Sequence, residues 1–100
     1  MTTYNKLVRD KIPEILDAKG IVYEKRIATD EEYKVELIKK IGEEYEEFKE
    51  AGNIEELADI LEVIESLKKL TDYSNVEEVR LRKLEEKGSF INRIILTGEK

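Results

Sequence analysis

The sequence predicts a mainly α-helical protein in which four helices form a bundle, organised as one domain over residues 1–100. Three observations support this prediction. Apolar residues recur at helical spacing, glycines and capping residues separate those stretches, and the chain has one proline and five glycines. A chain of 100 residues typically forms a single domain. No internal repeat or low-complexity linker divides it.

The first two helices follow from their end signals. A helix is predicted over residues 12–19, where Pro13 is tolerated in the opening turn and a glycine ends the helix. Thr29 and Glu32 then form a capping box for a long helix that ends near Gly52. The apolar stripe of this helix comprises Tyr33, Leu37, Ile38, Ile41, Tyr45 and Phe48.

Two more helices are predicted in the second half of the chain. Asn53 can cap a third helix, with Glu56 at the box position, and this helix ends near Thr71. Ser74 and Glu77 form a capping box for a fourth helix that ends before the next glycine. About two residues join the second and third helices, which predicts an antiparallel hairpin. The apolar stripe of the third helix comprises Leu57, Ile60, Leu61, Ile64, Leu67 and Leu70.

Two segments outside the helices have the composition of strands. Residues 21–27 alternate imperfectly between apolar and polar side chains, and residues 90–97 are rich in isoleucine. The two segments could pair as a short two-stranded ribbon. Because an isolated ribbon of two strands is weak, it would have to lean on the helices.

Composition restricts the chemistry. The chain has no histidine, cysteine or tryptophan, which excludes thiolate nucleophiles, disulfides, structural zinc sites and Ser–His catalysis. Acid–base or metal chemistry therefore depends on 24 carboxylates together with lysines and tyrosines. Oxygen ligands of this kind suit hard cations such as Mg²⁺ or Mn²⁺.

Net charge and hydropathy predict the partners and the location of the protein. A net charge of −6 argues against binding to nucleic acid or to an anionic membrane, because both need basic surfaces. No apolar run approaches the length of a membrane span, and the N-terminus lacks the apolar stretch of a signal peptide. We therefore expect a cytoplasmic protein.

Negative charge is concentrated in the centre of the sequence. Residues 43–65 contain ten acidic side chains and one basic side chain, whereas residues 1–27 and 66–100 are mildly basic. Nine pairs of like charges fall three or four residues apart in this stretch. Each pair costs about 0.2–0.5 kcal/mol on an isolated helix. A merely solvated helix face would intersperse lysines, so this pattern suggests a local role for the carboxylates.

Four carboxylates are predicted to converge between the second and third helices. Side chains three residues apart are neighbours on a helix, which pairs Glu44 with Glu47 and Glu56 with Asp59. Helical phase places Glu44 near, and Glu56 within, the apolar sector of its own helix, where an unpaired charge is expensive. A divalent cation would offset both desolvation and repulsion. On charge and phase alone, an acidic solvated surface with one accidentally buried glutamate is an equally good interpretation.

Two groups of basic residues lie outside the acidic centre. On the predicted fourth helix they recur on one face, as Arg80, Lys83 and Lys87. Before the first helix they are Lys6, Arg9 and Lys11. A metal-bound polyphosphate needs cationic groups on the oxygens that the metal does not reach. Taken without family context, ordinary surface charges are the favoured interpretation of both groups.

The motifs also resemble those of a known family. Residues 4–15 (YNKLVRDKIPEI) closely resemble the start of small phosphoribosyl-ATP pyrophosphohydrolase-like proteins, which belong to the MazG-like all-α nucleoside triphosphate pyrophosphohydrolase superfamily. Residues 43–48 (EEYEEF) resemble its EExxE motif, and residues 56–61 (ELADIL) its ExxD motif. Residues 87–96 resemble the closing glycine–phenylalanine segment, with Ser89 where glycine is commoner. The loop between the acidic motifs is shorter than in many members.

The resemblance implies a four-helix MazG-like bundle that hydrolyses a nucleoside triphosphate or related nucleotide at the α–β phosphate bond, releasing pyrophosphate in a house-cleaning role. It implies Mg²⁺, or Mn²⁺, as cofactor, a nucleotide as partner, and a homo-oligomer that is a dimer or larger. The implied metal ligands are Glu44, Glu47, Glu56 and Asp59. Glu43 or Glu47 would accept the proton of the attacking water, since the chain has no histidine. The implied phosphate contacts are Lys6, Arg9, Arg80 and Lys83.

Two other functions stay open at the level of sequence. The same helical scaffold could serve as a non-catalytic nucleotide-sensing or protein-interaction module, or as a plain oligomerisation domain. Replacement of Glu56 separates these functions. An enzyme should lose turnover, whereas a purely structural protein should keep or gain stability when a charge that faces the seam is removed.

Overall fold

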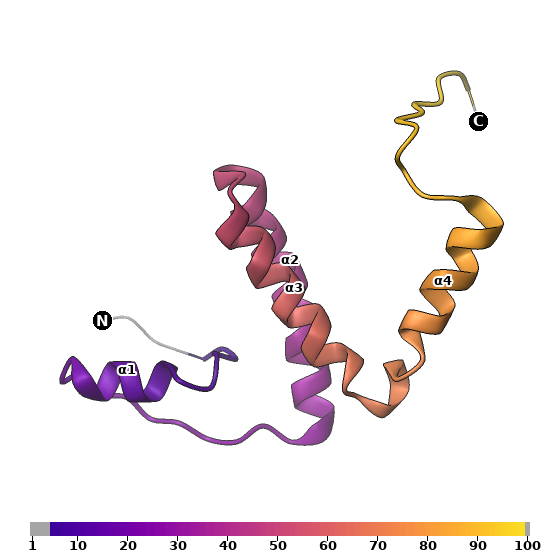
Figure 1. Cartoon of the computed structure of the whole chain (residues 1–100). Helices are drawn as coiled ribbons and strands as arrows, with labels where there is room; N and C mark the ends of the chain where they lie inside the picture. The colour runs from indigo at the N-terminus through magenta and orange to yellow at the C-terminus, as the bar shows by residue number, and fades with distance from the viewer. Residues whose placement is uncertain (1–4, 100) are drawn as a thin grey trace.

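The computed structural model describes residues 5–99, and these residues confirm the prediction of a mainly α protein with four α helices. The helices follow one another along an extended path (Figure 1). Tyr4, the first residue of the opening motif, lies outside the described residues. The elements are α1 (Ile12–Ala18), α2 (Asp30–Ala51), α3 (Ile54–Lys68), a 3₁₀ turn η1 (Thr71–Tyr73) and α4 (Val76–Lys87).

Helices α2 and α3 form the predicted antiparallel hairpin (Figure 1), and their ends carry the predicted caps. The Thr29 hydroxyl accepts a hydrogen bond from the backbone N–H of Glu32 at 3.2 Å. The Asn53 side chain accepts one from the N–H of Glu56 at 3.0 Å. Gly52 takes a left-handed conformation (φ 62°) that ends α2, which glycine adopts without the penalty of a side chain.

The seam between α2 and α3 contains both the small core and two carboxylates. Leu37 on α2 (3% exposed) and Val63 on α3 (8% exposed) are the buried apolar residues of the described chain. Buried and half-buried positions recur four and three residues apart. They are Leu37, Ile41, Glu44 and Phe48 on α2, and Glu56, Ile60, Val63 and Leu67 on α3. Glutamates therefore occupy two positions of the seam that apolar side chains would otherwise fill.

The structure corrects the predicted stripe and end of α3 and the predicted cap of α4. Leu61 is 54% exposed, so the centre of the seam on α3 is the sector of Val63 rather than the predicted stripe. Helix α3 ends at Lys68, and the η1 turn replaces the last predicted turn. Asn75, not Ser74, precedes α4, and its side chain makes no capping bond. The Ser74 hydroxyl instead donates to the carbonyl of Thr71 at 3.1 Å.

The predicted ribbon between residues 21–27 and 90–97 is wrong, because neither segment is a strand in the structure. The two segments lie at opposite ends of the molecule, so they do not pair (Figure 1). Their apolar side chains stay exposed, including Val22 at 95% and Phe90 at 97%. The alternation and the β-branched residues therefore mark apolar segments that pair with no strand within residues 5–99.

Helices α1 and α4 pack little on the hairpin, so the four helices do not close into a bundle within one copy. Tyr23 ties the following linker to α1, because its hydroxyl donates to Asp17 Oδ1 at 2.8 Å. The radius of gyration is 17.9 Å, against about 13 Å for a compact domain of this length. The bundle stays a prediction. None of the helices in residues 5–99 combines the length and the hydrophobicity that a membrane span requires.

Candidate metal centre

Four carboxylates from the hairpin come together at the α2–α3 seam. Glu44, Glu47, Glu56 and Asp59 each offer one carboxylate oxygen, and these four oxygens lie within 4.8 Å of one another. Glu44 and Glu47 are one helical turn apart on α2, and Glu56 and Asp59 are one turn apart on α3. The short loop makes the two pairs face each other. The predicted convergence of these side chains is therefore confirmed.

Two of the four side chains have oxygens that are cut off from solvent and from hydrogen-bond donors. Oε2 of Glu44 and Oε2 of Glu56 are buried and have no hydrogen-bond partner in the part of the chain that the structure describes. Buried polar atoms nearly always have a partner, because an unsatisfied one costs free energy. These two oxygens of the cluster thus lack a donor among residues 5–99, whereas Asp59 accepts a hydrogen bond from Arg9. An electropositive group between the two helices would satisfy them.

Burial and like charge both raise the pKa values in the cluster. The pKa of Glu44 rises above its ordinary value of 4.5, mainly because of burial and next because of the nearby Glu47 carboxylate. The pKa of Glu56 rises from the same value, again first through burial and then through Glu47 and Asp59. The folded chain therefore resists full ionisation of these carboxyls. A cation placed among them would reverse this tendency, since it favours the charged forms.

Two basic residues lie at the edge of the acidic cluster. The Arg9 guanidinium donates to Asp59 Oδ1 at 2.6 Å, which connects the segment before α1 to α3. The Lys40 ammonium lies 3.4 Å from Glu43 Oε2 and also acts against the raised pKa of Glu44. Sequence reasoning missed Lys40 as a neighbour of the cluster. Its position four residues before Glu44, one helical turn away, was the signal that could have identified it.

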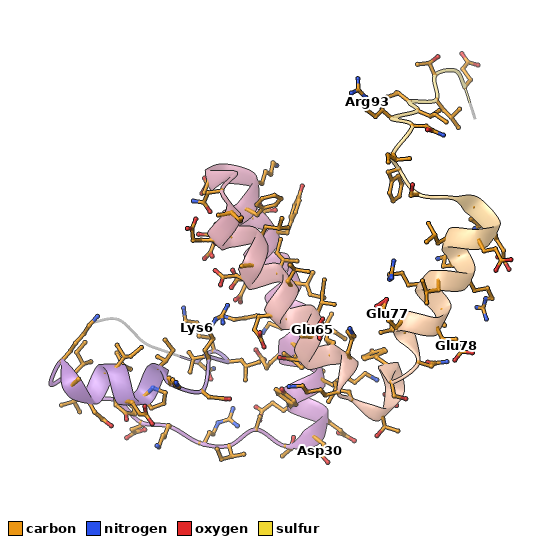
Figure 2. All side chains as sticks on the ribbon, in the orientation of Figure 1. Lys6, Asp30, Glu65, Glu77, Glu78 and Arg93 are labelled. Carbon is orange, nitrogen blue, oxygen red and sulfur yellow. The ribbon has the colours of Figure 1, made fainter. Side chains whose placement is uncertain are left out.

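The other predicted site residues lie outside the cluster. Glu43 is on α2 next to the cluster and pairs with Lys40. Lys6 is exposed on the segment that precedes α1 (Figure 2). Arg80 and Lys83 are exposed on α4, and Arg80 pairs there with Glu77. Figure 2 shows Glu77 and Glu78 at the start of α4, away from the acidic end of the hairpin. One copy of the chain does not bring Arg80 and Lys83 to the carboxylates.

Comparisons with protein-family models, with curated proteins and with solved structures found no match to this chain. What the structure shows of a site is an acidic cluster between two helices that could hold a metal ion. The superfamily assignment stays a prediction from the sequence motifs.

Proposed function

We propose that this chain is a divalent-cation-dependent nucleotide pyrophosphohydrolase, with Glu44, Glu47, Glu56 and Asp59 as ligands of Mg²⁺ or Mn²⁺. The convergence of four carboxylate oxygens within 4.8 Å of one another carries this proposal. The buried, unsatisfied oxygens of Glu44 and Glu56 fit a cation better than a solvated acidic face. The motif resemblance supports the reaction class, cleavage of a nucleotide between its α and β phosphates.

The donor set fits a hard cation. All four ligands are carboxylates, and Mg²⁺ commonly takes one or two protein carboxylates together with water and substrate phosphates. Four carboxylates at one site therefore suit a centre that also binds a polyphosphate. When bound there, the ion supplies a positive charge that polarises phosphate oxygens and acidifies a water molecule.

The side chains of this chain perform the proton transfer. In the proposed reaction a water oxygen forms a bond to the α-phosphorus, and the bond from that phosphorus to the bridging oxygen breaks. The products are a nucleoside monophosphate and pyrophosphate. Glu47, the exposed member of the cluster, or Glu43 beside it accepts the proton of the water, since the chain has no histidine for this role.

Basic residues complete the proposed site by binding phosphate. Arg9 already lies at the edge of the cluster through its contact with Asp59, and a guanidinium suits bidentate phosphate contacts. Lys6 belongs to the same segment and would act beside it. Arg80 and Lys83 would reach the nucleotide from α4 only after assembly, which is one reason to propose a homo-oligomer of two or more copies.

A nucleotide panel tests the proposal. Canonical and modified nucleoside triphosphates are incubated with the full chain and Mg²⁺ or Mn²⁺, and the products are identified. We expect pyrophosphate and nucleoside monophosphate from at least one of them, no orthophosphate, and no product when a chelator removes the cation. Absence of product over a broad panel contradicts the proposal. Nucleotide binding without turnover would favour a sensing module instead.

A pair of matched variants connects turnover to the cluster. Glu56→Gln keeps the size of the side chain but removes a proposed ligand, so we expect turnover to fall by at least about 100-fold. Glu65→Gln is the control, because Glu65 is an exposed glutamate of the same helix that pairs with Lys68 outside the cluster. The control should keep activity within about twofold. Helical content measured for both variants excludes loss of folding as the cause.

A further inference from the structure

The chain exposes far more surface than a folded monomer of its size. The accessible surface is 9481 Å². A compact protein of 11.7 kDa exposes about 5,900 Å², so the excess is about 3,600 Å². An obligate dimer interface removes roughly 1,000–2,500 Å² from each chain. The excess surface is thus larger than the area that one chain buries in an obligate dimer interface.

Two of the places where apolar side chains are exposed complement each other in shape and position along the chain. One is a groove of about 290 Å³ between the hairpin and the start of α4, which we call the apolar groove. The other is the C-terminal arm, comprising α4 and residues 88–97. Its last part holds five apolar side chains that are 73–97% exposed, namely Phe90, Ile91, Ile94, Ile95 and Leu96. The groove is lined by the side chains of Ile38, Ile41, Ile64, Leu67, Tyr73 and Val76 together with Lys68.

The arm cannot easily fill the groove of its own chain. Val76 is both the first residue of α4 and part of the groove lining. The arm therefore starts at the groove and runs away from it along 12 helical residues, about 18 Å, before the apolar tail begins. Figure 1 shows this course, with the tail beyond the far end of α4. A partner that brings its own arm to the groove needs no such reversal.

Charge favours the same pairing. The hairpin, residues 30–68, carries fourteen acidic and five basic side chains. The arm, residues 76–97, carries five basic and four acidic side chains, and two of the acidic ones lie in its first turn, before Arg80. Figure 2 shows Arg93 on the tail, remote from the hairpin of its own copy. An arm that lies on the hairpin of another copy would bring opposite charges together and steer association.

We infer that the C-terminal arm of one copy packs in the apolar groove of a second copy, and that the exchange is reciprocal. Each copy presents one groove and one arm, so a twofold axis makes two equal contacts and closes the dimer. The occupant of the groove is therefore a second copy of this chain. The inference rests on surface area, apolar side chains and charge, and it stands or falls independently of nucleotide hydrolysis.

Sedimentation velocity of the full chain, with and without acidic substitutions, tests this inference. We expect the wild-type chain to be a dimer at micromolar concentration. Phe90→Asp with Ile95→Asp should weaken association at least about 10-fold, because two interface side chains become charged. Val22→Asp with Ile27→Asp is the control, since these side chains are equally exposed (95% and 92%) but lie before α2. The control should associate like the wild type.

Three results of that experiment overturn the inference. They are a wild-type monomer at micromolar concentration, an arm variant that associates as strongly as the wild type, and a control variant that dissociates as strongly as the arm variant. Helical content of each variant shows whether the hairpin is still folded.

Cross-linking distinguishes exchange between copies from docking within one copy. The chain has no cysteine, so Ile38→Cys in the groove and Ile94→Cys in the arm each introduce the sole thiol of a copy. A mixture of the two variants, one of them tagged, should give a heterodimer with a short bis-maleimide. A mixture of Ile38→Cys with Val22→Cys should give little of it. A chain that carries Ile38→Cys and Ile94→Cys together and cross-links as a monomer would contradict exchange, as would equal yields in the two mixtures.

Discussion

The hairpin and the two flanking regions of this protein are stabilised in different ways. Helices α2 and α3 have side-chain caps, a left-handed glycine between them and a packed seam around Leu37 and Val63. Helices α1 and α4 lack side-chain caps and pack little on the rest of the chain. The difference shows that contacts within one copy define the hairpin, whereas the two flanking helices make few contacts with the rest of the described chain.

The largest change in the free energy of unfolding is expected for a substitution in the packed seam between α2 and α3. Leu37→Ala removes the least exposed side chain of the described residues, which is 3% exposed. Replacement of a buried leucine by alanine leaves a cavity, and we expect the free energy of unfolding to fall by about 2–5 kcal/mol. Urea denaturation followed by circular dichroism measures this change. Val35→Ala on the same helix is the control, because Val35 is 55% exposed, and its effect should stay within about 0.5 kcal/mol.

The second prediction compares the loss of stability at α3, which has a side-chain cap, with the loss at α4, which lacks one. Asn53→Ala removes the acceptor for the N–H of Glu56, and it should cost about 1 kcal/mol of the free energy of unfolding. Asn75→Ala at the start of α4 should cost less, since the Asn75 side chain makes no capping bond. Thermal melting of both variants measures the difference. Equal losses would mean that α4 has a cap that a single copy does not show.

Sequence could predict the hairpin because its signals are local. The two side-chain caps, the glycine stop and the short loop all act within a few residues, and the structure confirms each of them. The convergence of the four carboxylates follows from the same signals, because helical spacing and an antiparallel turn place them opposite each other. Local signals were therefore sufficient to predict the hairpin and the four carboxylates at its seam.

Other features depended on contacts that no local pattern encodes. Arg9 meets Asp59 across 50 residues of sequence, and nothing in either segment indicates that partner. The prediction of a two-stranded ribbon was wrong for a related reason. β-Branched residues form a strand only where another strand or an apolar surface packs against them. Ser74 satisfied the capping pattern for α4, but the η1 turn uses its hydroxyl and moves the start of the helix.

A third prediction concerns pH and the two glutamates of the seam. Their pKa values are raised above 4.5 in the folded chain, mainly by burial, so the unfolded chain binds fewer protons just above that pH. The free energy of unfolding should therefore fall as pH rises from 4.5 through the raised pKa values, when no divalent cation is present. Urea titrations over a pH series in chelator measure this slope.

The same titrations test the origin of the slope. Glu56→Gln should reduce it, because one of the two raised groups is removed, whereas Glu65→Gln on the surface should leave it unchanged. Added Mg²⁺ should stabilise the wild-type chain more at neutral pH than below pH 4.5, since it binds the ionised carboxylates. A slope that is identical in the chain with Glu56→Gln would assign the pH dependence to groups outside the seam.

The smallest expected effect lies in the linker before α2. Arg26 donates two hydrogen bonds to Glu32, both at 2.6 Å, and its side chain is 65% exposed. An exposed pair contributes about 0.2–1 kcal/mol, so Arg26→Ala should lower the free energy of unfolding by no more than this, and by less at high salt. Lys25→Ala is the control, because Lys25 forms no ion pair within residues 5–99.

Carboxyl titration by NMR makes this small effect measurable. The hydrogen bond from Arg26 lowers the pKa of Glu32, and the associated stability is present above 4.5 and lost as pH falls through the lowered pKa. Arg26→Ala should move the pKa of Glu32 up towards its ordinary value, while Lys25→Ala leaves it in place. An unchanged pKa of Glu32 would show that the linker is attached to α2 by contacts other than this ion pair. The linker before α2 would then belong to the stable hairpin rather than to the weakly attached flanks.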